Sequence, residues 1–153
     1  MERMRRLLDA ANNHSYVVHF CGLPDDLLAC TVPEMRRIFV DSRLTEDEQR
    51  GHLAHELGHL HTGDPCVKHP RTAAELARER RADRYAARLL IDPLTYARVE
   101  AINPDQHAIA DELGIPVEYV HVFEQDCLTQ VRGITYVHAK EGIGQWAHRG
   151  EVA

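Results

Sequence analysis

The chain has 153 residues, 44% of them hydrophobic and 27% charged, and its formal net charge at pH 7 is −6. A chain of this length suits one domain, with or without a small appendage, whose core is large enough to need no disulfide framework, and its composition is typical of a soluble globular protein. The negative net charge argues against a protein whose main function is to bind nucleic acid, because contacts with phosphate need clustered lysine and arginine.

The first forty residues carry patterns typical of one helix and three short strands. Residues 2–11 predict an amphipathic helix, and Tyr16-Val-Val-His-Phe20 predicts a strand. Two further strands are expected at 27–32 and 37–41, around a turn at Pro33-Glu34. Three short strands in succession favour an antiparallel sheet.

A capping box marks the start of the next helix. Thr45 is followed three residues later by Glu48, so the helix is expected to begin at about residue 46. Gly63-Asp64-Pro65 ends it. Within it a single apolar stripe recurs at helical spacing and predicts the face that packs on the core: Leu53, Leu57 and Leu60.

A second capping box, Thr72 with Glu75, opens another helix, which Asp92-Pro93 ends at about Ile91. Residues 105–130 suggest two more short helices, split at Gly114-Ile115-Pro116. The segment from residue 132 onward has little periodicity and receives no assignment.

The cysteines and the N-terminal residues indicate in which cellular compartment the protein is expected. The four cysteines form no C-x-x-C pair, so neither a disulfide scaffold nor a zinc ribbon is expected, and reduced thiols in a cytoplasm are the simplest interpretation. The basic start is followed by Leu7-Leu8 and then Asp9, which is too short for the apolar core of a signal peptide. No apolar run approaches the roughly 20 residues of a membrane span.

The helix from residue 46 contains a metal-binding pattern, His55-Glu56-Leu57-Gly58-His59. Residues four apart on an α-helix differ by about 40° in direction, so His55 and His59 share a face and can bind one ion. Glu56 borders the same cleft and can take a proton from water bound to that ion. The leucine stripe lies on the opposite side and anchors the helix.

A zinc hydrolase needs a third protein ligand and one position for water. The spacing H-E-x-x-H-x-x-G-x-x-H does not apply, because Thr62 and Pro65 occupy the positions that need glycine and histidine. The second helix instead offers Glu79, with Asp83 one turn later on the same face. Glu79 can bind the ion, and Asp83 can orient a ligand imidazole by accepting its other N–H. Small residues that flank this face would let the two helices approach closely: Ala82 and Ala86.

Other residues near these motifs have plainer interpretations. Glu75 is the alternative metal ligand, while His52 is expected to line the cleft without binding the ion. Cys66 is expected to be a structural thiol, because a thiolate ligand would close the site to water. The stripe of Arg80, Arg81, Arg84 and Arg88 is interpreted as a solvated helix face. Candidates for stabilising an oxyanion stay open: Tyr85, Tyr96, His61 and His69.

The two motifs together, with the Leu23-Pro24-Asp25 loop and the segment IFVDSRLT at 38–45, resemble the ImmA/IrrE family of gluzincin metallopeptidases over roughly residues 15–130. The resemblance implies a zincin-like α+β fold and a cytoplasmic endopeptidase with one Zn²⁺ per chain. The expected ligands are His55, His59 and Glu79, with Glu56 as general base and Asp83 supporting a ligand. Known members cut helix-turn-helix repressors of phages, mobile elements or stress regulons.

The predicted organisation is a metallopeptidase domain at 1–100, a helix-turn-helix-like segment at 101–131 and a tail at 132–153. The second helix of that segment would be the DNA reader, yet it carries Glu118, Glu124 and Asp126 and no basic residue. Phosphate repels such a helix, so the segment is interpreted as a structural element or a protein-contact surface, and direct nucleic-acid binding is not expected. The rival functions are a non-catalytic regulator that binds repressor or DNA, and a metal-stabilised structural or toxin–antitoxin module.

Overall fold

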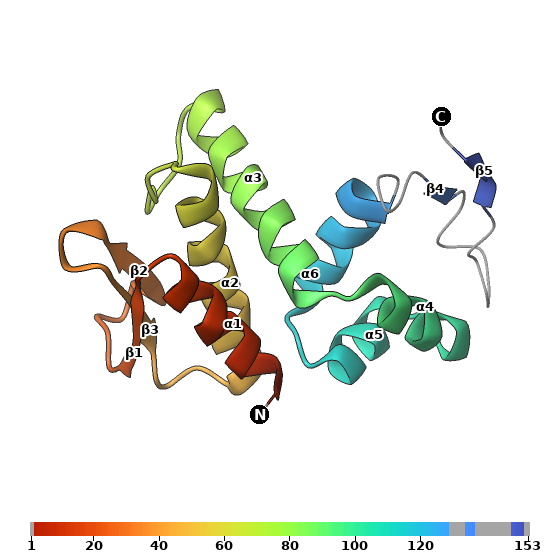
Figure 1. Cartoon of the computed structure of the whole chain (residues 1–153), viewed down its shortest axis with the longest axis horizontal. Coiled ribbons are helices and arrows are strands. Elements are labelled where there is room, and N and C mark those ends of the chain that lie inside the picture. The colour runs from red at the N-terminus through yellow and green to blue at the C-terminus, as the bar shows by residue number, and fades with distance from the viewer. Residues whose placement is uncertain (1, 129–133, 137–147, 152–153) are drawn as a thin grey trace. The chain divides into compact units, whose positions relative to one another are not determined.

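The computed structural model describes residues 2–128, 134–136 and 148–151, and the chain divides into two compact units, residues 1–86 and 87–153 (Figure 1). The predicted α+β class is confirmed: the first unit combines a three-stranded sheet with helices. The functional boundaries expected at residues 100 and 131 stay a prediction. Every helix in the described ranges is too short or too polar to cross a bilayer.

The sheet of the first unit has the strand order β1-β3-β2, with β1 at Val17–Cys21, β2 at Ala29–Val32 and β3 at Arg37–Asp41. β1 pairs parallel with β3, whereas β2 pairs antiparallel with β3. The prediction of an antiparallel sheet was therefore wrong for one of its two pairings. The chain reverses direction twice between β1 and β3, so these two strands point the same way when β3 inserts between the other two.

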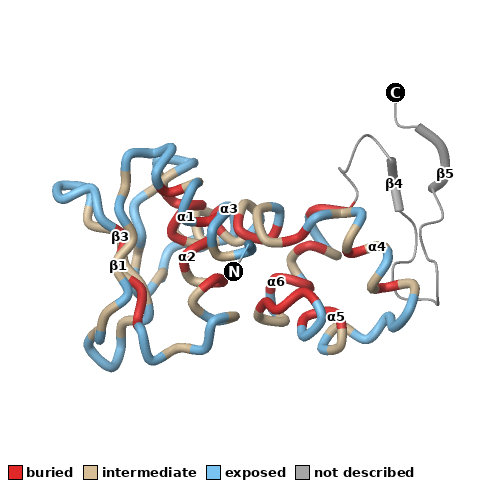
Figure 2. Tube along the Cα trace, turned by 60° about the horizontal axis from the view of Figure 1, so that its bottom comes forward, coloured by how far each residue is buried: buried red, intermediate tan, exposed pale blue. Residues whose placement is uncertain are grey.

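The central strand carries the best-buried side chains of the sheet. Ile38 and Val40 have no exposed surface, and they lie two residues apart, so they share one face. α2 packs on β2 and β3, and α1 (Glu2–Asn13) packs on β1 and α2. Figure 2 shows buried segments in α2 and in the sheet beside it. The core of this unit therefore lies between the sheet and these helices.

α2 spans Glu46–Thr62 and begins as predicted. The Glu48 backbone N–H donates to Thr45 Oγ1, and the Thr45 N–H donates to Glu48 Oε2, which completes the capping box. The helix ends at Gly63, whose φ of 71° lies in the left-handed region that favours glycine. Leu53 and Leu57 of the predicted stripe are fully buried.

α3 spans Ala73–Leu90 and also starts at its predicted capping box, because the Glu75 N–H donates to Thr72 Oγ1 and the Thr72 N–H donates back to Glu75 Oε2. Ala82 and Ala86 are fully buried, as expected of small residues at a helix contact. α2 and α3 approach each other closely: a Cβ built on Gly58 would lie 2.6 Å from the backbone oxygen of Ala82.

The second unit holds α4 (Pro93–Ile102), α5 (Gln106–Leu113), α6 (Val117–Val122) and the π-helical turn η2 (Phe123–Cys127). α4 was not predicted, because Asp92-Pro93 was interpreted as a stop. The same two residues begin α4: Asp92 accepts from the Thr95 N–H at 2.9 Å, and Pro93 occupies the first helical position. Two short strands pair antiparallel in the segment left unassigned: β4 (Ile134–Tyr136) and β5 (His148–Glu151).

Two carboxylates meet one tyrosine inside the second unit. Glu100 is 2% exposed, and the Tyr96 hydroxyl donates to Glu124 at 2.8 Å while lying 3.4 Å from Glu100 Oε1. Burial, together with the negative charge of Glu124, raises the pKa of Glu100 to about 7. Ionised Glu100 is therefore a source of instability at neutral and alkaline pH.

We expect Glu100→Gln to stabilise the protein at pH 8 by roughly 3 kcal/mol and to have little effect near pH 4.5. Between its ordinary pKa and the folded value of about 7, Glu100 keeps in the folded chain a proton that the unfolded chain has released. The free energy of unfolding therefore falls as pH rises through this interval, and glutamine removes that fall. Urea unfolding across this pH range measures it, with the exposed Glu118→Gln as control. An unchanged pH dependence in Glu100→Gln would contradict the assignment.

Candidate metal centre

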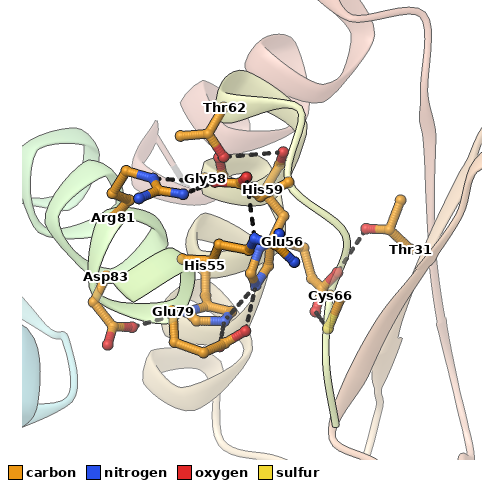
Figure 3. Close-up of polar contacts among 12 residues, drawn as sticks. Thr31, His55, Glu56, Gly58, His59, Thr62, Cys66, Glu79, Arg81 and Asp83 are labelled. Carbon is orange, nitrogen blue, oxygen red and sulfur yellow. Dashed lines mark hydrogen bonds and ion pairs between the residues drawn. The ribbon is translucent and has the colours of Figure 1, made fainter. Parts of the chain in front are cut away.

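Three side chains predicted to act together converge between α2 and α3 (Figure 3). His55, His59 and Glu79 each offer one ligand atom, and these atoms lie within 4.8 Å of one another. His55 Nε2 is 3.0 Å from His59 Nε2 and 3.1 Å from Glu79 Oε2, and His59 Nε2 is 3.4 Å from Glu79 Oε1. The two helices therefore bring the HExxH histidines and the distant glutamate to one point.

Asp83 fixes the orientation of the first imidazole. Its Oδ1 lies 2.8 Å from His55 Nδ1, and because an ionised carboxylate can only accept, His55 Nδ1 must carry the hydrogen. In the neutral ring Nε2 then presents its lone pair to His59 and Glu79. Burial lowers the pKa of His55, but the hydrogen bond and charge of Asp83, with the charges of Glu56 and Glu79, raise it above its ordinary value overall.

The second imidazole is more deeply buried, with 3% of its side chain exposed. Burial and the neighbouring His55 lower the pKa of His59, which favours the neutral ring that metals bind. His59 Nδ1 is buried without a hydrogen-bond partner among the described residues. His59 therefore lacks the outer support that Asp83 gives to His55.

The donor set fits a small divalent cation. Two imidazole nitrogens and a carboxylate face one another, and Glu79 Oε1 is buried with no hydrogen-bond partner in the described part of the chain. A tetrahedral zinc ion with bonds of about 2.0–2.1 Å separates its ligands by roughly 3.3 Å. The observed separations of 3.0 to 3.4 Å agree with that spacing, so little rearrangement is needed to surround such an ion.

Glu56 lies on the side of α2 that faces the sheet, and it is 3% exposed. Its Oε2 accepts a hydrogen bond of 2.6 Å from the Thr31 hydroxyl of β2, and its Oε1 lies 3.7 Å from Cys66 Sγ (Figure 3). Sequence reasoning missed Thr31. No motif marks it, and its partner is 25 residues away, so it reaches the site only because β2 packs against α2.

Cys66 is a thiol beside the site rather than a member of the converging group. Burial, with the charges of Glu56 and Glu79, raises the pKa of Cys66 to about 12. The side chain therefore stays protonated at neutral pH, where it can act as a weak donor to Glu56. Although its thiol contacts Glu56, the residue as a whole is exposed, and the structural role expected for it stays a prediction.

The structure gives other roles to several residues considered from the sequence. Glu75 accepts from the backbone N–H groups of Arg71 and Thr72, so it caps α3 and does not join the cluster. Tyr96 is fully buried, and its hydroxyl donates a hydrogen bond to Glu124. The His61 ring stacks on Tyr85 with centroids 4.4 Å apart. None of these contacts involves the three convergent donors.

The arginine stripe was expected to be a solvated helix face, and its four members are all exposed: Arg80, Arg81, Arg84 and Arg88. Arg81 Nη2 lies 2.9 Å from Asp64 Oδ2, and Arg78 Nε lies 3.8 Å from Asp64 Oδ1. Asp64 follows the end of α2, so these ion pairs join the end of the HExxH helix to α3. The contact supports the same helix pair that carries the donors.

A cavity of about 500 Å³ opens beside this centre within the first unit. His59 and Thr31 lie in its wall, so it adjoins both the donor cluster and the residue that contacts Glu56. The rest of its wall combines the largely apolar Tyr16, Pro33, Leu60 and Pro65 with Gly63, Asp64 and Cys66. The apolar part of this lining suits an apolar group.

Among known families, the chain matches the model described as Peptidase_M78, IrrE N-terminal-like domain, over residues 11–123. The matched range covers about three quarters of the chain and contains the sheet, α2 and α3. It therefore includes every residue of the donor cluster. No curated protein matches the chain.

Proposed function

The chain belongs to the Peptidase_M78 family of IrrE N-terminal-like domains, and on that premise we propose that it is a zinc-dependent endopeptidase with a zincin-like arrangement of its site. The observation that carries the proposal is the convergence of His55, His59 and Glu79 within 4.8 Å, with the buried Glu56 on the same helix as both histidines. A His2Glu set is typical of catalytic zinc, because it leaves a fourth position free for water or substrate.

His55, His59 and Glu79 would hold one Zn²⁺, and Asp83 would keep His55 in the tautomer whose Nε2 faces the ion. When bound, zinc would supply Lewis-acid chemistry, lowering the pKa of a water molecule and polarising the scissile carbonyl. The protein's share is to fix the ligand geometry in a buried site, where electrostatic effects are stronger than in water.

Glu56 would act as the general base and then as the general acid. It would take a proton from the attacking water and pass it to the leaving amine of the cleaved peptide bond. Its burial supports this role, because a carboxylate in a site of low dielectric keeps few solvent contacts that compete with the reacting water. The hydroxyl of Thr31 contacts Oε2 at 2.6 Å, while Oε1 has the longer and weaker contact with Cys66 Sγ at 3.7 Å.

The substrate we propose is a protein, and specifically a helix-turn-helix transcriptional repressor of a phage, mobile element or stress regulon, met in the cytoplasm. The family resemblance supports this choice, and the apolar part of the cavity beside His59 supports an apolar side chain next to the cleaved bond. α5 and α6, which flank a turn at Gly114-Ile115-Pro116, would form a helix-turn-helix-like contact surface for that protein. Deleting 104–130 without any change in substrate choice would contradict this last role.

The proposal predicts the metal content of three purified proteins. We expect about one zinc per chain in the wild type and loss of most of it in Glu79→Ala, because two imidazoles alone bind the ion weakly. Glu75→Ala is the matched control: this glutamate lies one turn earlier on the same helix but caps its start. Elemental analysis of protein purified without added metal measures the difference.

Zinc loss in Glu75→Ala with retention in Glu79→Ala would contradict the ligand assignment. Absence of zinc from the wild type, even after zinc is supplied, would contradict the proposed function. If the wild type binds zinc, incubating the zinc-loaded protein with a library of tryptic peptides identifies the bonds that it cleaves. We expect apolar residues to be enriched beside those bonds.

A further inference from the structure

Thr31 lies on an edge strand that faces α2. In the sheet order β1-β3-β2, β2 has one hydrogen-bonded neighbour. The register pairs Thr31 with Ile38, whose side chain is fully buried on the helix-covered face. Adjacent residues of a strand point to opposite faces, so a shift of one residue would turn the Thr31 hydroxyl away from α2. The pairing of β2 with β3 therefore fixes where this hydroxyl lies.

The contact between Thr31 and Glu56 has the geometry of a strong hydrogen bond. The hydroxyl donates to Glu56 Oε2 at 2.6 Å, within the range of about 2.5–2.7 Å for a hydroxyl bonded to a carboxylate. Glu56 is 3% exposed, so water cannot readily replace the donor. The other carboxylate oxygen has the more distant and weaker donor Cys66 Sγ at 3.7 Å.

We propose that Thr31 is a positioning residue for Glu56. A glutamate side chain has several freely rotating bonds, and a general base must stay within hydrogen-bond reach of the proton that it takes. The bond from Thr31 holds one carboxylate oxygen toward the sheet and so fixes the other relative to the donors on α2 and α3. The inference rests on the proposed function for its kinetic consequence, and the hydrogen bond itself is testable without catalysis.

The kinetic experiment compares two substitutions that separate the hydroxyl from the methyl group. Thr31→Val keeps the shape of the side chain, and of the cavity wall to which it contributes, but removes the donor. We expect it to lower kcat by roughly 10- to 100-fold while KM stays within about twofold. Thr31→Ser keeps the donor and should stay within about threefold of wild-type kcat. The probe is the most rapidly cleaved member of the tryptic peptide library.

A second experiment uses thermal unfolding of the full, metal-free chain in a double-mutant cycle. Thr31→Val leaves a buried carboxylate without its main donor, so the unfolding midpoint should fall by roughly 3–6 °C. In the Glu56→Ala background the same substitution should change the midpoint by about 1 °C or less, because the partner is gone. Zinc content should match the wild type in Thr31→Val and Thr31→Ser.

These measurements distinguish the failure of the inference from that of the proposed function. The inference would be overturned if Thr31→Val lowered the unfolding midpoint equally in the wild type and in the Glu56→Ala background. It would also be overturned if Thr31→Val and Thr31→Ser changed kcat equally, because Thr31 would then act through packing. An unchanged kcat in Thr31→Val would overturn it as well. A wild-type protein that binds no zinc and cleaves no peptide would refute the proposed function, while the cycle would still establish or refute the bond.

Discussion

Glu56→Gln is expected to lower kcat by roughly 10³-fold or more while leaving zinc content near one per chain. The amide keeps the size of the side chain and can still accept from the Thr31 hydroxyl, so the local packing should survive. It cannot take a proton from water, and positioned general acid–base groups contribute about 10²- to 10⁴-fold to rate. Because Glu56 is outside the group of converging donors, the ligand set stays complete.

The measurement is cleavage of a library-derived peptide by zinc-loaded protein, paired with elemental analysis of the same samples. Glu46→Gln is the matched control, since Glu46 lies on the same helix but is exposed in its first turn. Activity that survives in Glu56→Gln would contradict the proposed peptidase mechanism, in which Glu56 is the general base. It would favour a metal-stabilised module without catalysis. Loss of zinc from Glu56→Gln would instead assign this residue to the ligand set.

Gly58→Ala is expected to separate α2 from α3 and so to weaken both the fold and the site. The added Cβ would lie 2.6 Å from the Ala82 backbone oxygen and 2.8 Å from its Cα. Backbone atoms cannot move aside as a flexible side chain can, so the helices themselves must shift. Overpacking of this kind costs about 1–3 kcal/mol, and the better helix propensity of alanine offsets up to about 1 kcal/mol of it.

The same shift should lower zinc affinity by at least about tenfold, because Glu79 lies one turn from Ala82 on the helix that is pushed away. Urea unfolding and competition with a zinc chelator measure the two effects. Gly22→Ala is the control, as a Cβ at that position meets no atom within 4 Å. Wild-type zinc affinity in Gly58→Ala would show that the site tolerates a wider helix spacing than we infer.

The fold was predicted best where short-range chemistry decides it. The capping boxes at Thr45 and Thr72 placed the starts of α2 and α3, because the bonds that begin a helix join residues three apart. The same local reasoning failed at Asp92-Pro93, since a proline that ends one helix can also occupy the first turn of the next. It also failed for the β1–β3 pairing, which depends on the path of the chain between strands.

The sequence by itself determined that His55, Glu56 and His59 share one helix at a spacing fixed by the α-helical repeat. It also presented Glu79 and Asp83 as candidates, because their own spacing places them on one face of another helix. Only the tertiary structure decided that these faces meet, through the contact of Gly58 with Ala82, and that Thr31 meets Glu56. The physical reason is that helical periodicity is local, whereas the meeting of two helices and a strand depends on packing between residues far apart in the chain.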